Sequence, residues 1–343
     1  MSGVVRVLLV GAGRAGMVHA RNLAAGLPGG QLAGIADPSR AAREQAIAQL
    51  GDVVAAHDDP VKAVIRDEVD AVVIASPTFT HADVAVAALA AGKHVLCGKP
   101  LASTLEEATR IAAAERTSSA TLLMGFMRRF DAGFQRVAER IAAGDIGAPL
   151  LVKSTGRGPG LPPEWAWDTA RSGGLVAEVN SHDLDTVRWL SGQEPTRVYA
   201  VGRAAKRPDL AQRYPGFVDL VALTLELSDG AIAMVDGACP ADYGYDARVE
   251  VYGSEGVLFA GDPRRGSVML VDRDGAAMDA VRSWRDLFAE AYRAEDRHLV
   301  AVARGEAQPR TTVDDGVQAL RAVFAANDSL QRGVPVSIGE VGG

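Results

Sequence analysis

Three side chains in this sequence, Lys99, Glu178 and His182, are of types that can move a proton to or from an alcohol. An imidazole with an ordinary pKa of about 6.5 can take a proton from a hydroxyl group at neutral pH. Glu178 precedes His182 by four residues in a predicted helix over 173–192, so both share one helix face and the carboxylate can orient the ring. The alternative is an ordinary surface Glu–His pair.

Lys99 lies two residues after the apolar segment His94–Cys97, which predicts a buried strand, and precedes Pro100. A residue before proline is held extended. In a parallel sheet, the carboxyl ends of the strands border the crevice where ligands bind, so an ammonium here can reach a ligand. The alternative is a solvated surface lysine.

A glycine-rich turn follows the apolar, β-branched segment Val4–Val10. The order strand, G-x-G-x-x-G and helix predicts a dinucleotide site, in which glycines allow a tight turn and a close approach to a pyrophosphate at the helix N-terminus. The alternative is a glycine turn without a ligand. The expected cofactor contacts in this turn are Gly11, Ala12, Gly13, Arg14, Ala15 and Gly16.

Asp37 closes the next predicted strand, Gln31–Ala36. A carboxylate at this point can accept hydrogen bonds from both ribose hydroxyls and repels a 2′-phosphate, which favours NAD over NADP. Arg40 lies close in sequence and could pair with a phosphate, so NADP stays open. The alternative function of Asp37 is a helix cap before Pro38 and Ser39.

Strands and helices alternate up to residue 124, which predicts a doubly wound parallel sheet of the Rossmann type over residues 1–124. The predicted strands are Val4–Val10, Gln31–Ala36, Ala71–Ala75, His94–Cys97 and Thr121–Met124, and the predicted helices are Arg14–Ala25, Ser39–Leu50, His81–Ala91 and Thr104–Thr117.

The loop after the strand Ala71–Ala75 supplies further candidate cofactor contacts at Ser76, Pro77, Thr78 and His81. A Ser-Pro-Thr loop can lie along the nicotinamide side of a dinucleotide. It can equally be a helix start with Thr80 as the cap.

Residues 125–343 are predicted to form a second, substrate-binding and oligomerisation domain. From Leu150 the alternation stops, and turn-separated strands predict a large, mostly antiparallel open sheet covered by helices on one face. The uncovered face needs a partner, so we expect a homo-oligomer. A closing helix over 312–331 either stays with this domain or packs back on the first. The predicted strands are Leu150–Thr155, Arg197–Arg203, Asp219–Leu227, Ala231–Asp236, Arg248–Tyr252, Gly256–Phe259 and Ser267–Val271.

A loop over 156–168 carries two tryptophans, whose indole faces can stack on a sugar-like ring or pack against the domain. Arg129, Arg157, Trp165 and Tyr245 are the weaker candidates for substrate contacts, beside Lys99, Glu178 and His182. Arg128, Gly98 and Lys99 are candidates for cofactor contacts.

The composition limits the partners of this chain. The net charge is −7, whereas nucleic-acid-binding proteins carry an excess of basic residues, so we expect no nucleic-acid partner. No apolar segment reaches membrane-spanning length, and the N-terminus opens into a strand without a signal peptide. Two cysteines make no disulfide framework, which fits the cytoplasm. We expect a small-molecule substrate and no metal.

Three motifs, the glycine turn at 11–16, Gly98-Lys99-Pro100, and Gly173-Gly174 followed by Glu178 and His182-Asp183, resemble the Gfo/Idh/MocA oxidoreductase family over essentially the whole chain. The segments 125–131 and 243–254 look like its inositol dehydrogenases. In place of the family glutamate and aspartate, this chain has Gly98 and Glu178.

The resemblance implies Lys99 and His182 as a catalytic pair. It implies hydride transfer between NAD and a secondary alcohol or ketone of a cyclic polyol or sugar, in a dimer or tetramer formed through the open sheet face. Two alternatives stay open: a sugar enzyme that recycles bound NAD during elimination or glycoside cleavage, and a non-catalytic NAD-binding regulator.

Overall fold

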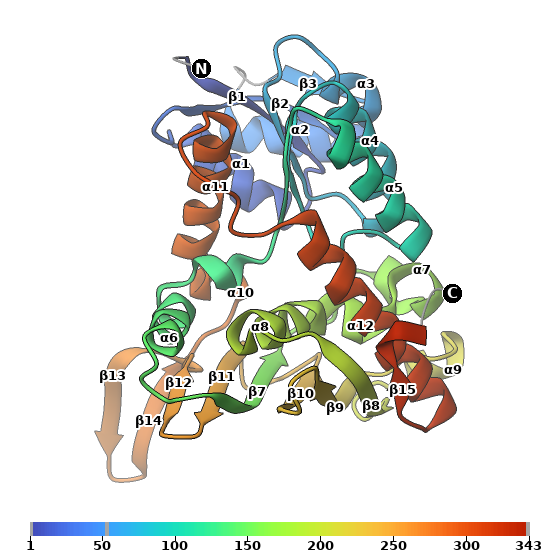
Figure 1. Ribbon diagram of the computed structural model, residues 1–343. Helices are drawn as coiled ribbons and strands as arrows, with labels where there is room; N and C mark the ends of the chain where they lie inside the picture. Colours follow the sequence, from blue (N-terminus) through green and yellow to red (C-terminus); the bar gives the residue numbers. More distant parts are fainter. Residues whose placement is uncertain (1–2, 52–54, 341–343) are drawn as a thin grey trace. The chain divides into compact units, whose positions relative to one another are not determined.

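The computed structural model describes residues 3–51 and 55–340 (Figure 1). The described chain falls into two compact units. The first runs to Phe130 and also includes Glu290–Val317. The second comprises Asp131–Ala289 and the chain from Gln318 onward.

The first unit is built on a six-stranded parallel sheet with the order β3-β2-β1-β4-β5-β6, in the described residues. This is the strand order of a dinucleotide-binding doubly wound fold, so the predicted Rossmann sheet is confirmed. Its strands are β1 (Val5–Val10), β2 (Gly30–Ala36), β3 (Ala55–His57), β4 (Ala71–Ile74), β5 (His94–Cys97) and β6 (Leu122–Met124). Its helices are α1 (Gly16–Ala24), α2 (Arg40–Leu50), α3 (Pro60–Val64), α4 (His81–Ala90), α5 (Leu105–Thr117) and α11 (Ala289–Ala303), with short turns η1 (Thr78–Thr80) and η2 (Met127–Phe130).

The central strands are apolar on both faces because helices cover both. Strand β4 is buried along its whole length. On one face, α1 packs against Leu299 and Val300 of α11, a helix from far along the chain (Figure 1). Each fully buried side chain of this size contributes roughly 1.5–3 kcal/mol to folding. This core holds the carboxyl ends of β1, β2, β4 and β5 in a fixed array.

The second unit is built on a seven-stranded sheet with the order β12-β11-β7-β10-β9-β8-β15. The pair β7–β10 is parallel and the others are antiparallel, as predicted for a mostly antiparallel sheet. Its strands are β7 (Pro149–Arg157), β8 (Pro195–Arg203), β9 (Leu220–Leu227), β10 (Ile232–Ala238), β11 (Asp246–Gly253), β12 (Val257–Ala260) and β15 (Val336–Ser337). Its helices and turns are α6 (Ala132–Ala142), η3 (Glu164–Trp167), α7 (Thr169–Ser172), the π-helical turn η4 (Val176–Asn180), α8 (Ser181–Ser191), α9 (Pro208–Arg213), α10 (Trp284–Leu287), η5 (Ile338–Glu340) and α12 (Val313–Arg332), whose first residues count with the first unit.

Side chains in this sheet point alternately to its two faces, most regularly in β9. In β9, exposed and buried residues alternate along all of Leu220–Leu227. The buried face packs under α8 (Figure 1). The other face carries exposed apolar side chains, among them Met234, Tyr252 and Phe259.

Two predictions for this unit are corrected by the structure. The predicted strand Ser267–Val271 lies in β13 (Arg264–Asp272), which pairs only with β14 (Gly275–Ala280) in a separate two-stranded sheet of the described chain. The predicted helix 173–192 is present but is not α-helical throughout: Gly173 and Gly174 at its start have left-handed backbones, and residues 176–180 form a π-helical turn that leads directly into α8.

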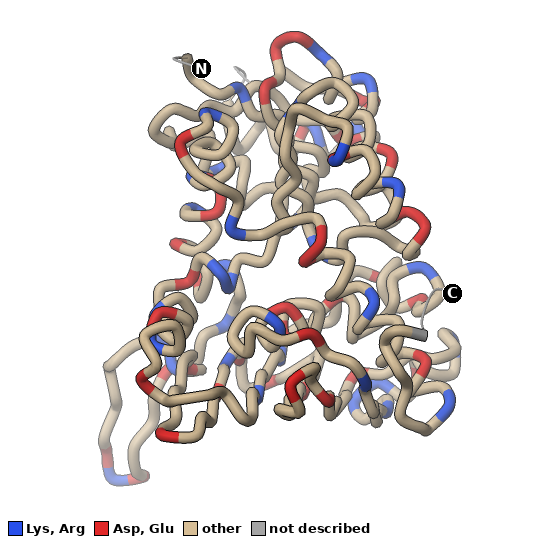
Figure 2. The backbone as a smooth tube through the Cα atoms, viewed as in Figure 1, with Lys and Arg blue, Asp and Glu red and all other residues tan. Residues whose placement is uncertain are grey.

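Charged residues of both signs are interspersed over the elements of each unit (Figure 2). Among the described residues, no helix is long and apolar enough to cross a membrane. Nor do three or more His, Cys, Asp or Glu side chains gather as metal ligands anywhere within 3–51 and 55–340.

Candidate functional site

In the glycine turn, backbone atoms lie close to the two outer glycines, whereas the space beside the middle glycine is open. Gly11 has φ +93°, and a Cβ atom there would lie 2.6 Å from the Ser76 amide nitrogen. A Cβ atom at Gly16 would overlap the Gly11 carbonyl oxygen. No atom lies within 4 Å of a Cβ atom built at Gly13. The outer glycines therefore let the turn fold tightly, and the middle one leaves open space for an approaching group.

The N-terminus of α1 directly follows this turn. Its N-cap residue, Ala15, makes no side-chain capping bond, and the first turn holds no acidic residue. The first N–H groups of a helix carry partial positive charge and have no partners within the helix. These groups, with the space at Gly13, suit a phosphate.

Asp37 ties the glycine turn to the end of β2. Its Oδ2 accepts a hydrogen bond from the Ala12 amide at 2.9 Å, and its Oδ1 accepts one from the Ser39 amide at 2.8 Å. Arg43, which sequence analysis missed, donates to the Asp37 carbonyl oxygen at 2.6 Å. Arg40 is exposed and pairs with Glu44 at 2.7 Å, one turn along α2.

The loop after β4 is held by hydroxyl groups and by one buried histidine. Thr80 Oγ1 donates to the Pro77 carbonyl oxygen at 2.8 Å and lies 2.6 Å from Ser76 Oγ. Thr80 is the N-cap residue of α4, as the alternative predicted, but its side chain makes no capping bond to that helix. Thr78 is buried.

His81 is 1% exposed and lies behind this loop. Its Nε2 is 3.0 Å from the Ser76 carbonyl oxygen, and its Nδ1 is 3.0 Å from that of Pro100. Burial lowers the pKa of His81, so the ring is neutral at pH 7 and donates from one nitrogen only. His81 thus links the segments before and after Lys99 rather than presenting its ring to a ligand.

Lys99 lies at the end of β5, half-buried, and is joined to Pro100 by a cis peptide bond. At the neighbouring Gly98, a Cβ atom would lie 3.0 Å from the Ile74 carbonyl oxygen and 3.8 Å from the His81 ring. Burial raises the pKa of the Cys97 thiol to about 12, which keeps it protonated and excludes it as a nucleophile.

Both arginines of η2 are buried. The Arg129 guanidinium donates to Asp315 Oδ1 at 2.8 Å and to the Arg310 carbonyl oxygen at 3.1 Å. These bonds assign it to the packing of the first unit. Arg128 is 1% exposed.

In the second unit, Glu178 and His182 lie on successive turns of η4 and α8. Glu178 is half-buried, and His182 is 8% exposed. The Thr186 hydroxyl donates to the His182 carbonyl oxygen at 2.7 Å. Both residues therefore belong to elements, η4 and α8, that pack on one face of the seven-stranded sheet.

Arg157 lies on the other face of that sheet. Its Nε donates to Asp236 Oδ1 at 2.5 Å, and its Nη1 donates to Tyr243 Oη at 3.3 Å. Because strand residues alternate, and Gly156 faces α8, Arg157 faces away from it. The structure thus does not bring Arg157 together with His182.

The two aromatic candidates are half-buried. The Tyr245 ring contacts Phe288 edge to face, with 6.2 Å between centroids. Trp165 lies in η3. Its neighbour Trp167 donates to the Pro162 carbonyl oxygen at 2.9 Å and contacts Tyr214.

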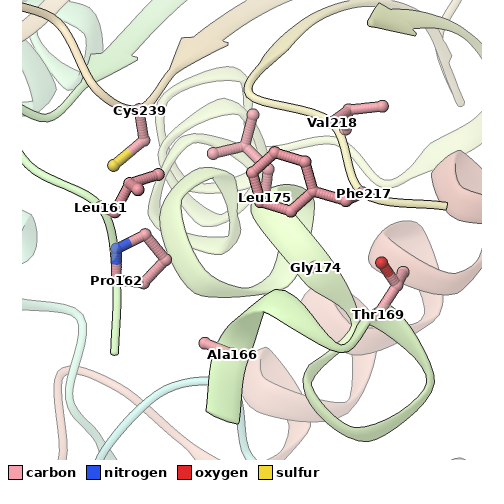
Figure 3. Close-up of a pocket in the computed structure, with 9 residues that line it drawn as sticks. All are labelled: Leu161, Pro162, Ala166, Thr169, Gly174, Leu175, Phe217, Val218 and Cys239. Atoms are coloured by element: carbon pink, nitrogen blue, oxygen red, sulfur yellow. The ribbon is translucent and has the colours of Figure 1, made fainter. Parts of the chain in front are cut away.

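A small cavity lies beside this loop (Figure 3). Its volume of about 10 Å³ has room for one water molecule and not for a sugar ring. Within the described chain, the buried Thr169 hydroxyl has no hydrogen-bond partner, so a water molecule suits it. The lining residues are Leu161, Pro162, Ala166, Thr169, Gly174, Leu175, Phe217, Val218 and Cys239.

The residues present fit a dinucleotide. The cradle at Gly13, the uncapped start of α1 and the Asp37 carboxylate are the three parts that a pyrophosphate and an adenosine ribose require. They define the first unit as a Rossmann-type nucleotide-binding domain, joined in this chain to a second domain with its own ionisable residues.

Comparison with known proteins also identifies the first unit as a nucleotide-binding domain. Residues 5–126 match the NAD-binding Rossmann domain of the Gfo/Idh/MocA oxidoreductase family, and residues 134–259 match a Gfo/Idh/MocA C-terminal domain. The chain belongs to this family and is an NAD-binding oxidoreductase.

The relatives include two curated inositol dehydrogenases. The chain is 34% identical to scyllo-inositol 2-dehydrogenase (NAD(+)) of Bacillus subtilis, over 98% of this chain and 97% of that protein. It is 33% identical to myo-inositol 2-dehydrogenase of Thermotoga maritima, over 98% and 99%. The crystal structure of scyllo-inositol dehydrogenase from Lactobacillus casei with bound NAD(H) and scyllo-inositol matches with a TM-score of 0.90, 27% identity, and 98% and 100% coverage.

Proposed function

We propose that this chain is an inositol 2-dehydrogenase, which oxidises one ring hydroxyl of a cyclic polyol to a ketone or catalyses the reverse reduction. The observation that carries the proposal is full-length similarity to curated inositol dehydrogenases, at 34% identity over 98% of this chain. The side chains that such chemistry needs are present as Lys99 and His182.

Oxidised nicotinamide, when bound, supplies the hydride acceptor. The turn Gly11–Gly16 and the start of α1 would hold the pyrophosphate, and Asp37 would accept from the adenosine ribose. Ser76, Pro77 and Thr78 follow β4, beside Gly11, and would line the nicotinamide side. Because Asp37 is an anion and Arg40 is already paired with Glu44, this end of the site favours NAD over NADP.

The proton of the reacting hydroxyl passes to the His182 imidazole, which acts as general base. The Lys99 ammonium donates a hydrogen bond to the same oxygen and stabilises its developing negative charge, a role worth roughly 3 kcal/mol per donor. Glu178 orients His182 and stabilises the imidazolium. Trp165 and Tyr245 are candidates for shaping the pocket around the polyol ring.

The direct test is purified protein with NAD⁺ and a panel of myo-inositol, scyllo-inositol and common sugars, followed by NADH absorbance. Steady release of NADH with an inositol supports the proposal. Release with sugars only would move the substrate class to sugars. Lack of turnover on the whole panel, with both NAD⁺ and NADP⁺, would overturn it.

We further propose that the protein is a cytoplasmic homo-oligomer, a dimer or tetramer. The exposed face of the seven-stranded sheet supports this proposal, because it carries the large apolar side chains of Met234, Tyr252 and Phe259. A partner subunit would remove them from water. Both cysteines are free and buried, which suits a reducing compartment.

A further inference from the structure

The turn that carries Glu178 has an unusual backbone. Residues Val176–Asn180 form a π-helical turn directly before α8. Such a turn contains one more residue than an α-helical turn, and its isolated occurrences are concentrated at functional sites. Because π turns are rare within helices, the contacts around this one are informative.

Those contacts lie where two glycines pair across the sheet. Gly156 of β7 and Gly237 of β10 are direct register partners. A Cβ atom at Gly156 would overlap Asp183 Oδ2, and one at Gly237 would overlap Asn180 Oδ1. We call this pair the glycine seat. It lets the side chains of Asn180 and Asp183 lie directly on the strand backbones.

The side chains in the seat are bonded to each other and to the sheet. Ser154 Oγ donates to Asp183 Oδ1 at 2.6 Å, and Asn180 Nδ2 donates to Asp183 Oδ2 at 2.9 Å. Both Asn180 and Asp183 are fully buried. A buried polar group is costly unless it is hydrogen-bonded, so these bonds favour the one orientation of the helix over the sheet in which the donors reach Asp183. Apolar side chains packed over the same area would let the helix slide along the sheet.

We propose that Asp183 is a positioning residue: seated on Gly156 and Gly237 and bonded to Ser154 and Asn180, it fixes the π turn and thereby sets where Glu178 and His182 lie. The inference rests on the proposed function, in which His182 accepts the proton. Asp183 directly follows His182, and Asn180 lies between His182 and Glu178. A displacement of about 1 Å at a reacting group can lower a rate by about 100-fold.

The main test is Asp183→Asn in the full-length protein. Its amide has the size of the carboxylate but places an N–H group against Ser154 Oγ or Asn180 Nδ2, both of which donate to Asp183. We expect kcat with inositol to fall about 10- to 100-fold, while the Kd of NAD⁺ stays within twofold. The solvent deuterium isotope effect on kcat should rise, because transfer of the proton becomes slower. A loss of folded protein would lower kcat and leave the isotope effect unchanged.

A second variant pair tests the seat itself. Gly237→Ala places a methyl group against Asn180, and Asn180→Ala removes the atoms that it meets. We expect Gly237→Ala to lower kcat at least 10-fold in the native background and less than 3-fold in the Asn180→Ala background. Equal losses in both backgrounds would contradict the steric basis of the seat.

Ser154→Ala is the milder substitution if Asp183→Asn does not fold, with an expected 3- to 10-fold loss of kcat. Ser191→Ala, near the end of α8, removes a hydroxyl bonded within the helix and is the matched control, expected to leave kcat unchanged.

Hydrogen exchange separates this inference from the proposed function. Peptides over 174–186 should exchange faster in Asp183→Asn than in the native protein, with the rest of the chain unchanged. If the native protein oxidises no polyol, the proposed function fails, and this exchange pattern still decides whether Asp183 holds the turn. Unchanged exchange together with unchanged kcat would overturn the inference.

Discussion

The Ala12 amide donates to Asp37 Oδ2 at 2.9 Å, and this bond joins the glycine turn of β1 to the end of β2. One carboxylate therefore has two functions. It fixes the backbone that would hold the pyrophosphate, and it places a negative charge where the adenosine ribose would bind. The second oxygen is fixed by the Ser39 amide, so the carboxylate cannot turn away.

Replacing Asp37 by alanine should therefore weaken NAD⁺ binding. The ratio of the Kd of NADP⁺ to the Kd of NAD⁺ should decrease as well. Loss of hydrogen bonds to a charged group costs about 1.5–3 kcal/mol, which corresponds to a 10- to 150-fold higher Kd for NAD⁺. The Kd of NADP⁺ should rise less, since a repulsion is removed. Calorimetric titration measures both. Arg40→Ala is the control, because its side chain is exposed and paired with Glu44, and it should change neither value more than twofold.

Much of the first unit could be predicted from the sequence because its strands are buried on both faces. A continuously apolar segment such as Ala71–Ile74 is typical of a strand inside a parallel sheet, where both faces are buried. Strand β3 was missed because it is a short edge strand with two exposed alanines. The return of α11 to the first unit carries no local signal, since long-range packing decides it.

The candidate site was harder to predict, because residue type does not reveal which face a side chain takes. Arg157 looks like a ligand contact in sequence, but the strand alternation pairs it with Asp236 on the face away from α8. Asp183 belongs to a sequence motif, but what it and Asn180 contact is visible only in the structure, where Gly156 and Gly237 lie side by side. Lys99 and His182 stand out by residue type and position in the sequence, and the resemblance to a family pairs them as catalytic residues, whose roles stay predictions.

Replacing Lys99 by alanine should separate catalysis from cofactor binding. The variant loses one hydrogen-bond donor to the reacting oxygen, so kcat should fall about 100-fold, the effect of removing roughly 3 kcal/mol of stabilisation. The Kd of NAD⁺ should change less than threefold, because the phosphate and ribose contacts are elsewhere in the first unit. Steady-state kinetics and NAD⁺ titration provide the two numbers. Lys62→Ala, which removes an exposed lysine, controls for the change of charge. Undiminished kcat in Lys99→Ala would remove Lys99 from the mechanism.

Charged substitutions on the exposed face of the seven-stranded sheet test whether this face joins subunits. Phe259 is 69% exposed on β12, and Met234 is 46% exposed on β10. If this face joins subunits, Phe259→Glu and Met234→Glu would bury an unpaired carboxylate and should shift the protein toward monomer. Light scattering after size-exclusion chromatography measures the mass. Val61→Glu, at an exposed position of α3 in the first unit, is the control and should keep the native mass. A native protein that is monomeric at micromolar concentration would contradict the proposed assembly.

A buried acid cluster between α1 and α11 predicts how stability depends on pH. Burial raises the pKa of Glu295 to about 8, and in the described chain neither of its carboxylate oxygens has a hydrogen-bond partner. Nearby, His19 Nδ1 lies 2.6 Å from Asp296 Oδ1; burial opposes the charge on His19, but the attraction of Asp296 raises its pKa.

For Glu295, the folded protein binds more protons than the unfolded chain between pH 4.5 and about 8. The free energy of unfolding therefore decreases as pH rises through this window, and His19 acts in the same direction above pH 6.5 because its folded pKa is raised. Glu295→Gln mimics the protonated acid. We expect equal Tm values at pH 5 and a Tm a few degrees higher for the variant at pH 8.5, measured by calorimetry. Glu290→Gln, on the exposed side of α11, should follow the native protein at both pH values. Parallel Tm curves for native protein and Glu295→Gln would show that Glu295 is already ionised in the folded state.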